Sequence, residues 1–133
     1  MSRSGISRET LFRILAVLFV GAAIYHAIAF FLSAFSAGGS PWRHGIFCAI
    51  DLICAGFLLR RPRWFVTAFG ILTLQALNSH GHHAWMLQHE QRRLDWLSFA
   101  VLLVMPLTMA LLIADCIERR SVDSASVKGV SRK

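Results

Sequence analysis

Four runs of apolar residues, separated by short polar or charged segments, divide the chain. The first run, 14–35, contains no Asp, Glu, Lys or Arg, and it is as long as a membrane-spanning helix, which needs about 20 apolar residues. Further helices are predicted at about 41–60, 64–79 and 96–114. Because the connections are short, the pattern predicts an all-α membrane protein, an antiparallel four-transmembrane-helix bundle.

The segments between and after these runs set the expected domain limits. Ser40 and Pro41 are typical of a helix start, and Gly81 is typical of a helix end. Residues 80–95, rich in His and Gln, are predicted to form a loop with one helical turn at about 84–91. We therefore expect a single four-helix domain over 1–121 and a disordered basic cytoplasmic tail over 122–133.

Composition supports the membrane interpretation. Of the 133 residues, 56% are apolar and only 16% are charged, against roughly 25% in a soluble domain. A chain of this length cannot bury so much apolar surface against itself in water. The formal charge of +7 lies between and beyond the apolar runs, without a basic, aromatic-rich face, so we expect no nucleic-acid partner.

The distribution of basic residues predicts the orientation. Eleven of the fourteen Lys and Arg residues fall at the N-terminus, at 60–63 or after 118, and only Arg43, Arg92 and Arg93 fall on the other side. Under the positive-inside rule, both termini are cytoplasmic, in a multi-pass protein of the cell (inner) membrane. The three cysteines form no CxxC motif and are expected to be apolar filler within helices.

All six histidines fall in the predicted outer half of the membrane or in the outer loops. From the helical rise of about 1.5 Å per residue, His26 and His44 lie roughly 20 and 24 Å above the inner boundary, near the depth of Gln75 and Asn78. His80, His82 and His83 place three imidazoles within four residues. Imidazole suits zinc, copper, nickel and iron, so this pattern favours a transition-metal site, with zinc or copper ahead of haem. The metal-ligand candidates are His80, His82, His83, His26 and His44. In the alternative interpretation, the loop histidines are interfacial polar residues and His26 is hydrogen-bonded within the bundle.

Asp51 is a carboxylate in the middle of a predicted span, which costs roughly 2.5–3.5 kcal/mol on insertion scales. It must face the bundle interior, carry a proton or find a polar partner, and the candidate partners are Tyr25, His26, Thr73 and Gln75. Together with Gln75 and Asn78 it forms the predicted set of buried polar or relay residues. Two roles stay open: proton or cation handling, and a hydrogen bond between helices that stabilises packing.

No pair of nucleophile and base and no cofactor fingerprint is present, so the sequence does not favour an enzyme. The first hypothesis is an outward-facing histidine cluster that binds or handles a transition metal. The second is an accessory, assembly or immunity-type subunit of a larger membrane complex. A haem-binding or a proton- or cation-translocating bundle is a third. Besides the lipid bilayer, the expected partner is another membrane protein or a second copy of the chain.

Overall fold

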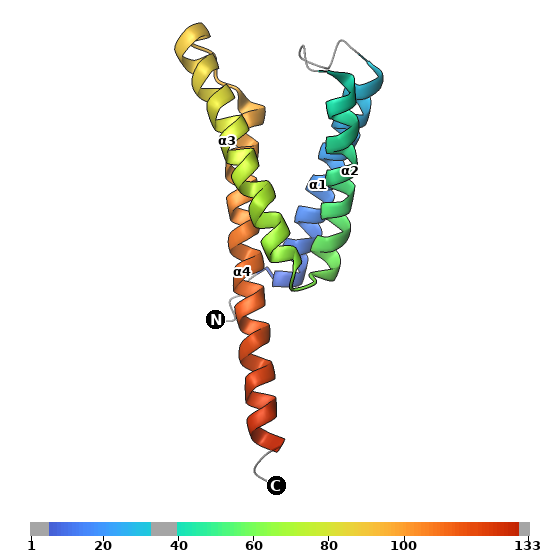
Figure 1. The fold of residues 1–133 in the computed structure, drawn as a ribbon, viewed down its shortest axis with the longest axis vertical. Coiled ribbons are helices and arrows are strands. Elements are labelled where there is room, and N and C mark those ends of the chain that lie inside the picture. Colours follow the sequence, from blue (N-terminus) through green and yellow to red (C-terminus); the bar gives the residue numbers. More distant parts are fainter. Residues whose placement is uncertain (1–5, 33–39, 131–133) are drawn as a thin grey trace. The chain divides into compact units, whose positions relative to one another are not determined.

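The computed structural model describes the backbone of residues 6–32 and 40–130 and the side chains up to residue 124. Over these residues the chain is all-helical, with four helices: α1 (Arg8–Phe31), α2 (Pro41–Arg60), α3 (Phe65–Gln91) and α4 (Trp96–Val130). The all-α prediction is thus confirmed for the described part of the chain. The helices form two compact units, Met1–Arg61 and Pro62–Lys133, each a helical hairpin (Figure 1).

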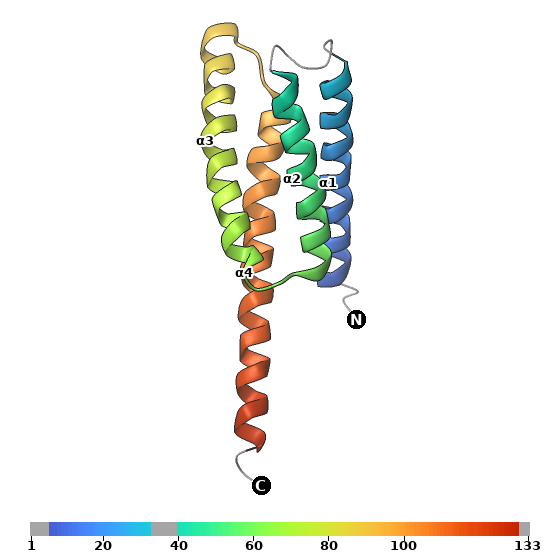
Figure 2. The same cartoon turned by 45° about the vertical axis from the view of Figure 1, so that its right-hand side comes forward.

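In the first hairpin, α1 and α2 lie side by side in both views (Figures 1 and 2). Helix α1 begins at an N-cap, Ser7, whose side chain accepts a hydrogen bond from the Thr10 amide at 3.1 Å. The facing surfaces are tightly packed: Phe12 and Phe19 on α1 and Leu58 on α2 are all less than a tenth exposed. Helix α1 ends at Phe31, and Leu32 takes an extended conformation; the predicted end at 35 lies outside the described residues. Helix α2 has the predicted bounds.

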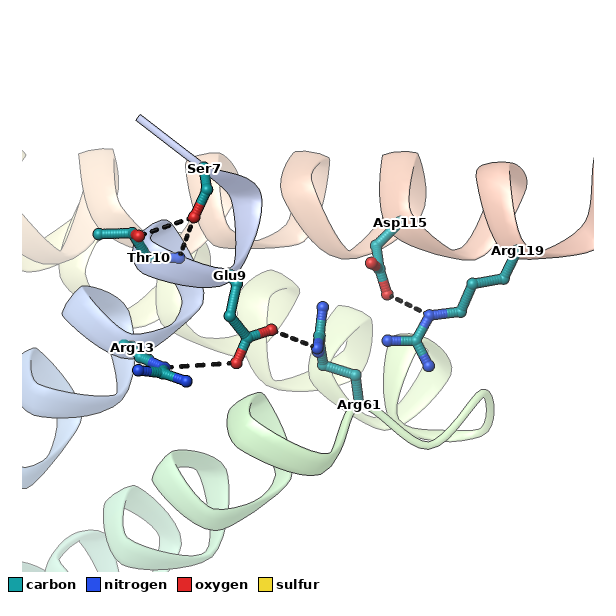
Figure 3. A network of polar contacts seen from close by, with 7 residues as sticks. All are labelled: Ser7, Glu9, Thr10, Arg13, Arg61, Asp115 and Arg119. Atoms are coloured by element: carbon teal, nitrogen blue, oxygen red, sulfur yellow. Dashed lines mark hydrogen bonds and ion pairs between the residues drawn. The ribbon is translucent and has the colours of Figure 1, made fainter. Parts of the chain in front are cut away.

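An ion pair joins the C-terminal end of α2 to the start of α1 (Figure 3). Arg61 follows α2 in a left-handed conformation, with φ of 50°, and its guanidinium donates to Glu9 Oε2 at 2.6 Å. The same guanidinium lies over the Phe12 ring, 4.9 Å from its centroid. Glu9 also pairs with Arg13, one helical turn further along α1. Charge pairing and a cation–π contact therefore join the start of α1 to the end of α2.

The second hairpin pairs α3 with α4 through a core that includes Phe65 and Phe69, which are 2% and 0% exposed. A Cβ on Gly70 would lie 3.2 Å from Met109 Cε, so the absence of a side chain there allows close packing. Helix α3 continues to Gln91, and a short turn at 92–95 leads into α4. The predicted third helix, 64–79, and the predicted loop after it are therefore corrected: residues 80–91 are helical, and the connection has only four residues.

Helix α4 is also longer than the predicted 96–114. It continues through 115–130, so residues 122–130 of the expected disordered tail are helical, while 131–133 lie outside the described residues. Polar contacts accompany this extension: Arg119 pairs with Asp115 at 2.9 Å, one turn apart (Figure 3), and Arg63 pairs with Asp123. The Arg119–Asp115 pair has the i,i+4 spacing that stabilises a helix by a few tenths of a kcal/mol. The Arg63–Asp123 pair instead joins the segment before α3 to α4.

Three of the four helices are long and apolar enough to cross a membrane: α1, α2 and α4 as far as Ser124. Helix α3 does not meet that criterion among the described residues. Its apolar run is interrupted by polar residues from Gln75 onward, and these lower the mean hydropathy of any segment long enough to span a membrane. The prediction of a membrane protein is supported by three helices, and the prediction of four spans is not matched in full.

Candidate functional site

The five predicted metal ligands are divided between the two hairpins. His26 and His44 belong to the α1–α2 hairpin, while His80, His82 and His83 lie on α3. Among the described residues, no group of three or more His, Cys, Asp or Glu side chains is placed to hold a metal ion. Gln75 and Asn78, predicted as buried relay residues, are exposed on the α3–α4 hairpin. Neither hairpin by itself brings the five predicted ligands together.

The α1–α2 hairpin instead joins His26, His44 and Asp51 into what we call the α1–α2 polar cluster. His26 Nδ1 lies 3.0 Å from His44 Nδ1, which is hydrogen-bond distance for two ring nitrogens. On the opposite side of the same ring, His26 Nε2 lies 3.8 Å from Asp51 Oδ2. The His26 imidazole thus stands between an imidazole and a carboxyl group, with one ring nitrogen toward each.

Helix geometry explains how these three side chains meet. His44 and Asp51 are seven residues apart, two turns of α2, so they share one face of that helix. Gly45 lets α1 approach there: a Cβ at this position would meet the Phe30 ring at 3.3 Å. The close approach brings the end of α1 against the start of α2, where His26 can reach both partners on the shared face.

Aromatic rings surround the imidazoles of this cluster. Phe47 stacks on His26 with ring centroids 5.4 Å apart, and Tyr25 meets His26 edge-on at 5.3 Å. Tyr25 also approaches His44, with centroids 6.4 Å apart. These contacts restrict the rotation of the rings, so both nitrogens of His26 are held toward their partners.

The carboxyl group of Asp51 is poorly satisfied. Its side chain is only 15% exposed, and Oδ2 is buried without a hydrogen-bond partner among the described residues. Arg13 and Arg61 of the same hairpin pair with Glu9, at the opposite end from His44. A buried polar atom that lacks a partner costs about 1–3 kcal/mol. Buried polar groups without a partner are rare, and a catalytic or proton-handling role is one reason a protein retains such a group.

A second cluster lies where α3 meets α4, and we call His80, His83, Asp95 and Ser98 the α3–α4 polar cluster. Asp95 caps α4, since Oδ1 accepts hydrogen bonds from the amides of Leu97 and Ser98 at 3.1 and 3.3 Å. Its carboxylate also lies at the positive end of the α4 helix dipole, where a negative charge stabilises the helix. Asp95 Oδ2 accepts from the Ser98 hydroxyl at 2.5 Å, and His80 Nδ1 lies 3.0 Å from the same hydroxyl oxygen.

Electrostatics in this second cluster favour a neutral imidazole beside an ionised carboxylate. Burial lowers the pKa of His80 below its ordinary value; the Asp95 charge opposes this and the His83 imidazole adds to it. For Asp95, burial alone would raise the pKa, but the hydrogen bonds from Ser98 and the nearby His83 outweigh it and leave the pKa below its ordinary value.

Sequence reasoning missed Ser98, which is 2% exposed and links His80 to Asp95. The available signal was the Asp-x-x-Ser spacing at the start of a helix, which resembles a capping pattern.

Comparisons with protein-family models, with curated proteins and with solved structures found no match to this chain.

Proposed function

We propose that this chain is a non-enzymatic, multi-pass protein of the cell (inner) membrane that takes up protons from the outer side and delivers them to Asp51. The membrane part of the proposal is supported by the three helices that are long and apolar enough to span a bilayer. Helix α3 packs along α4 as the other arm of its hairpin. If α4 spans the bilayer, α3 therefore crosses the bilayer beside it. With both termini cytoplasmic, the four helices form an antiparallel bundle.

The proposed orientation is testable at the C-terminus. Eleven basic residues on one side predict that Lys133 is cytoplasmic. A reporter enzyme that is active only outside the cytoplasm, fused after Lys133, should be inactive, whereas the same reporter inserted at 92–93 should be active. Activity at Lys133 would contradict the orientation, and with it the assignment of the histidines to the outer side.

The observation that carries the functional proposal is the line of contacts from His44 through His26 to Asp51. An imidazole can accept a proton on one ring nitrogen while it releases one from the other. His44 is the fourth residue of α2 and Asp51 the eleventh, so the line covers about 10 Å along the helix axis. In the proposed orientation it runs from near the outer boundary toward the middle of the membrane.

The transfer balances, because one proton enters from water at His44 and one proton ends on Asp51. At the start, His44 Nδ1–H donates to His26 Nδ1, and His26 carries its own proton on Nε2, facing Asp51. A proton from water binds His44 Nε2. The Nδ1 proton of His44 then passes to His26 Nδ1 while the Nε2 proton of His26 passes to Asp51 Oδ2. Both imidazoles end neutral and Asp51 ends protonated, after the 3.8 Å separation has shortened to hydrogen-bond distance.

Removal of the central imidazole tests this relay. In His26→Phe, the ring can still stack on Phe47 but carries no nitrogen. After rapid acidification of protein in lipid vesicles, time-resolved infrared spectroscopy should show the carboxyl band of Asp51 appearing about 100-fold more slowly than in the wild type, within the range that a positioned acid–base group contributes. The band is assigned to Asp51 by its loss in Asp51→Asn.

The matched control is His89→Phe, which changes an exposed histidine that contacts Trp85 on α3. Its band should appear at the wild-type rate. Equal rates in His26→Phe and the wild type would show that protons reach Asp51 without His26, and the relay would be rejected.

A further inference from the structure

An open groove runs along the α1–α2 hairpin, away from the residues of the relay. Its volume is about 620 Å³, within the roughly 300–1,000 Å³ that is usual for ligand pockets. Every residue that lines it belongs to α1 or α2, and all of them are apolar except Arg13. We call this feature the α1–α2 groove.

Small residues form the floor of the α1–α2 groove. Ala16 on α1 and Ala55 on α2 are buried, and small side chains of this kind let two helices approach closely. A Cβ on Gly56 would meet no atom within 4 Å, so the space over this residue is open. The larger side chains of Val17 and Leu52 also line the groove and are exposed. The surface between the two helices is therefore hollowed, and apolar side chains border the hollow.

The groove begins near one end of the hairpin and continues into the apolar part of both helices. On α1 it extends from Arg13 to Val20, about 10 Å along the helix axis. Leu59, next to the last residue of α2, lines the same end as Arg13, since the two helices are antiparallel. In a bilayer, the groove therefore leads from the boundary of the membrane into its hydrocarbon layer. This inference rests on the membrane location proposed above and not on the proton relay.

Arg13 can bind an anion at the mouth of the groove. In the described part of the chain its guanidinium pairs with Glu9 through Nε, at 3.4 Å, and the side chain is exposed (Figure 3). The same carboxylate also accepts from Arg61 at 2.6 Å, so one negative charge is shared by two guanidinium groups. The two terminal nitrogens of Arg13 are left to donate to a phosphate, which a guanidinium binds with two parallel hydrogen bonds.

The charge at this end of the hairpin favours an anionic ligand. Between residue 6 and Arg13 and in the last turn of α2 with Arg61, four arginines stand against one glutamate, a formal charge of +3. Basic groups at the boundary of a membrane attract anionic lipid headgroups. A partner helix would use neither this charge nor the short groove, because a helix that spans the hydrocarbon layer is about 30 Å long.

We propose that the α1–α2 groove binds an anionic phospholipid, with one acyl chain along Ala16, Ala55 and Gly56 and the phosphate on Arg13. The acyl chain fills the space over Gly56, and the headgroup compensates the excess positive charge of the arginines. Both parts of the lipid are needed, since the groove offers an apolar surface and the arginine a single ionic contact.

The test is native mass spectrometry of the full-length protein, extracted from membranes in a neutral detergent and depleted of lipid. Dioleoyl phosphatidylglycerol or dioleoyl phosphatidylcholine is then added. The wild type should hold one phosphatidylglycerol per chain and bind it at least about fivefold more tightly than phosphatidylcholine, as expected for one arginine near the headgroup. Arg13→Gln should lose this preference. Equal binding of the two lipids by the wild type would contradict the role of Arg13.

Gly56→Leu tests the groove itself. Leu has a higher helix propensity than Gly and meets no atom there, so the variant should fold, which circular dichroism checks. Its side chain fills the groove, and binding of both lipids should be lost. Gly21→Leu is the matched control: a Cβ at Gly21 also meets no atom within 4 Å, but the residue does not line the groove. This variant should bind lipid as the wild type does.

Three other results would overturn the proposal. Loss of lipid in Gly21→Leu equal to that in Gly56→Leu would show that the groove has no special role. Displacement of the lipid by glycerol phosphate would show that the headgroup binds alone. A wild-type dimer that Gly56→Leu dissociates would assign the groove to a second copy of the chain. Recovery of the protein in membranes and the infrared measurement on Asp51 test the proposed function separately, so failure of lipid binding counts against the groove alone.

Discussion

Replacement of Asp51 by Asn is expected to leave a folded protein that no longer takes up the relayed proton. Asn has nearly the same size and can still form a hydrogen bond, but it cannot accept the proton that leaves His26 Nε2. In a pH-jump experiment, Asp51→Asn should therefore take up one proton fewer per chain than the wild type. Glu90→Gln, which removes an exposed carboxylate from the last turn of α3, is the control and should show no loss beyond its own titration.

Asp51→Leu distinguishes a role of Asp51 in proton transfer from a role in helix packing. Asp51 Oδ2 has no hydrogen-bond partner among the described residues, so its replacement breaks few contacts. On insertion scales, Leu at the centre of a span is favoured over Asp by about 3 kcal/mol. Asp51→Leu should therefore unfold at a higher SDS fraction than the wild type, while it loses proton uptake. A destabilised Leu variant, together with normal uptake in Asp51→Asn, would assign Asp51 to packing instead.

Truncation of Phe69 is expected to cause the largest loss of stability in the α3–α4 hairpin. The ring is 0% exposed and packs against Phe65, with centroids 5.5 Å apart. Phe→Ala changes in protein cores cost about 3–5 kcal/mol, through lost transfer energy and the cavity left behind. In a bilayer the unfolded reference is also apolar, so the cavity accounts for most of the cost and we expect about 2–3 kcal/mol.

The measurement for Phe69→Ala is an SDS titration followed by circular dichroism. Leu74→Ala serves as the matched control, because Leu74 lies on the same helix and is 69% exposed. Its midpoint should stay close to that of the wild type. Equal shifts in the two variants would indicate that burial within this hairpin does not determine the stability of α3.

The agreement between sequence and structure is best where a long apolar run ends at a strong local signal. Ser40 and Pro41 start α2, and the basic turn after Arg60 ends it, as predicted. The agreement is poorest at Gly81 and the histidine tract, where a helix end was expected. Gly costs only about 1 kcal/mol inside a helix. Contacts with α4, where His80 meets Ser98, outweigh that local preference and continue α3 to Gln91.

The sequence by itself determined the helical class, the apolar character of three spans and the face that His44 shares with Asp51, because each follows from the periodicity of one helix. Only the tertiary structure decided that His26 stands between His44 and Asp51, that His80 meets Ser98 and that His83 approaches Asp95. Those contacts depend on which helices pair and on the rotation of each about its axis. Packing between side chains from distant parts of the chain determines both, and no local pattern records them.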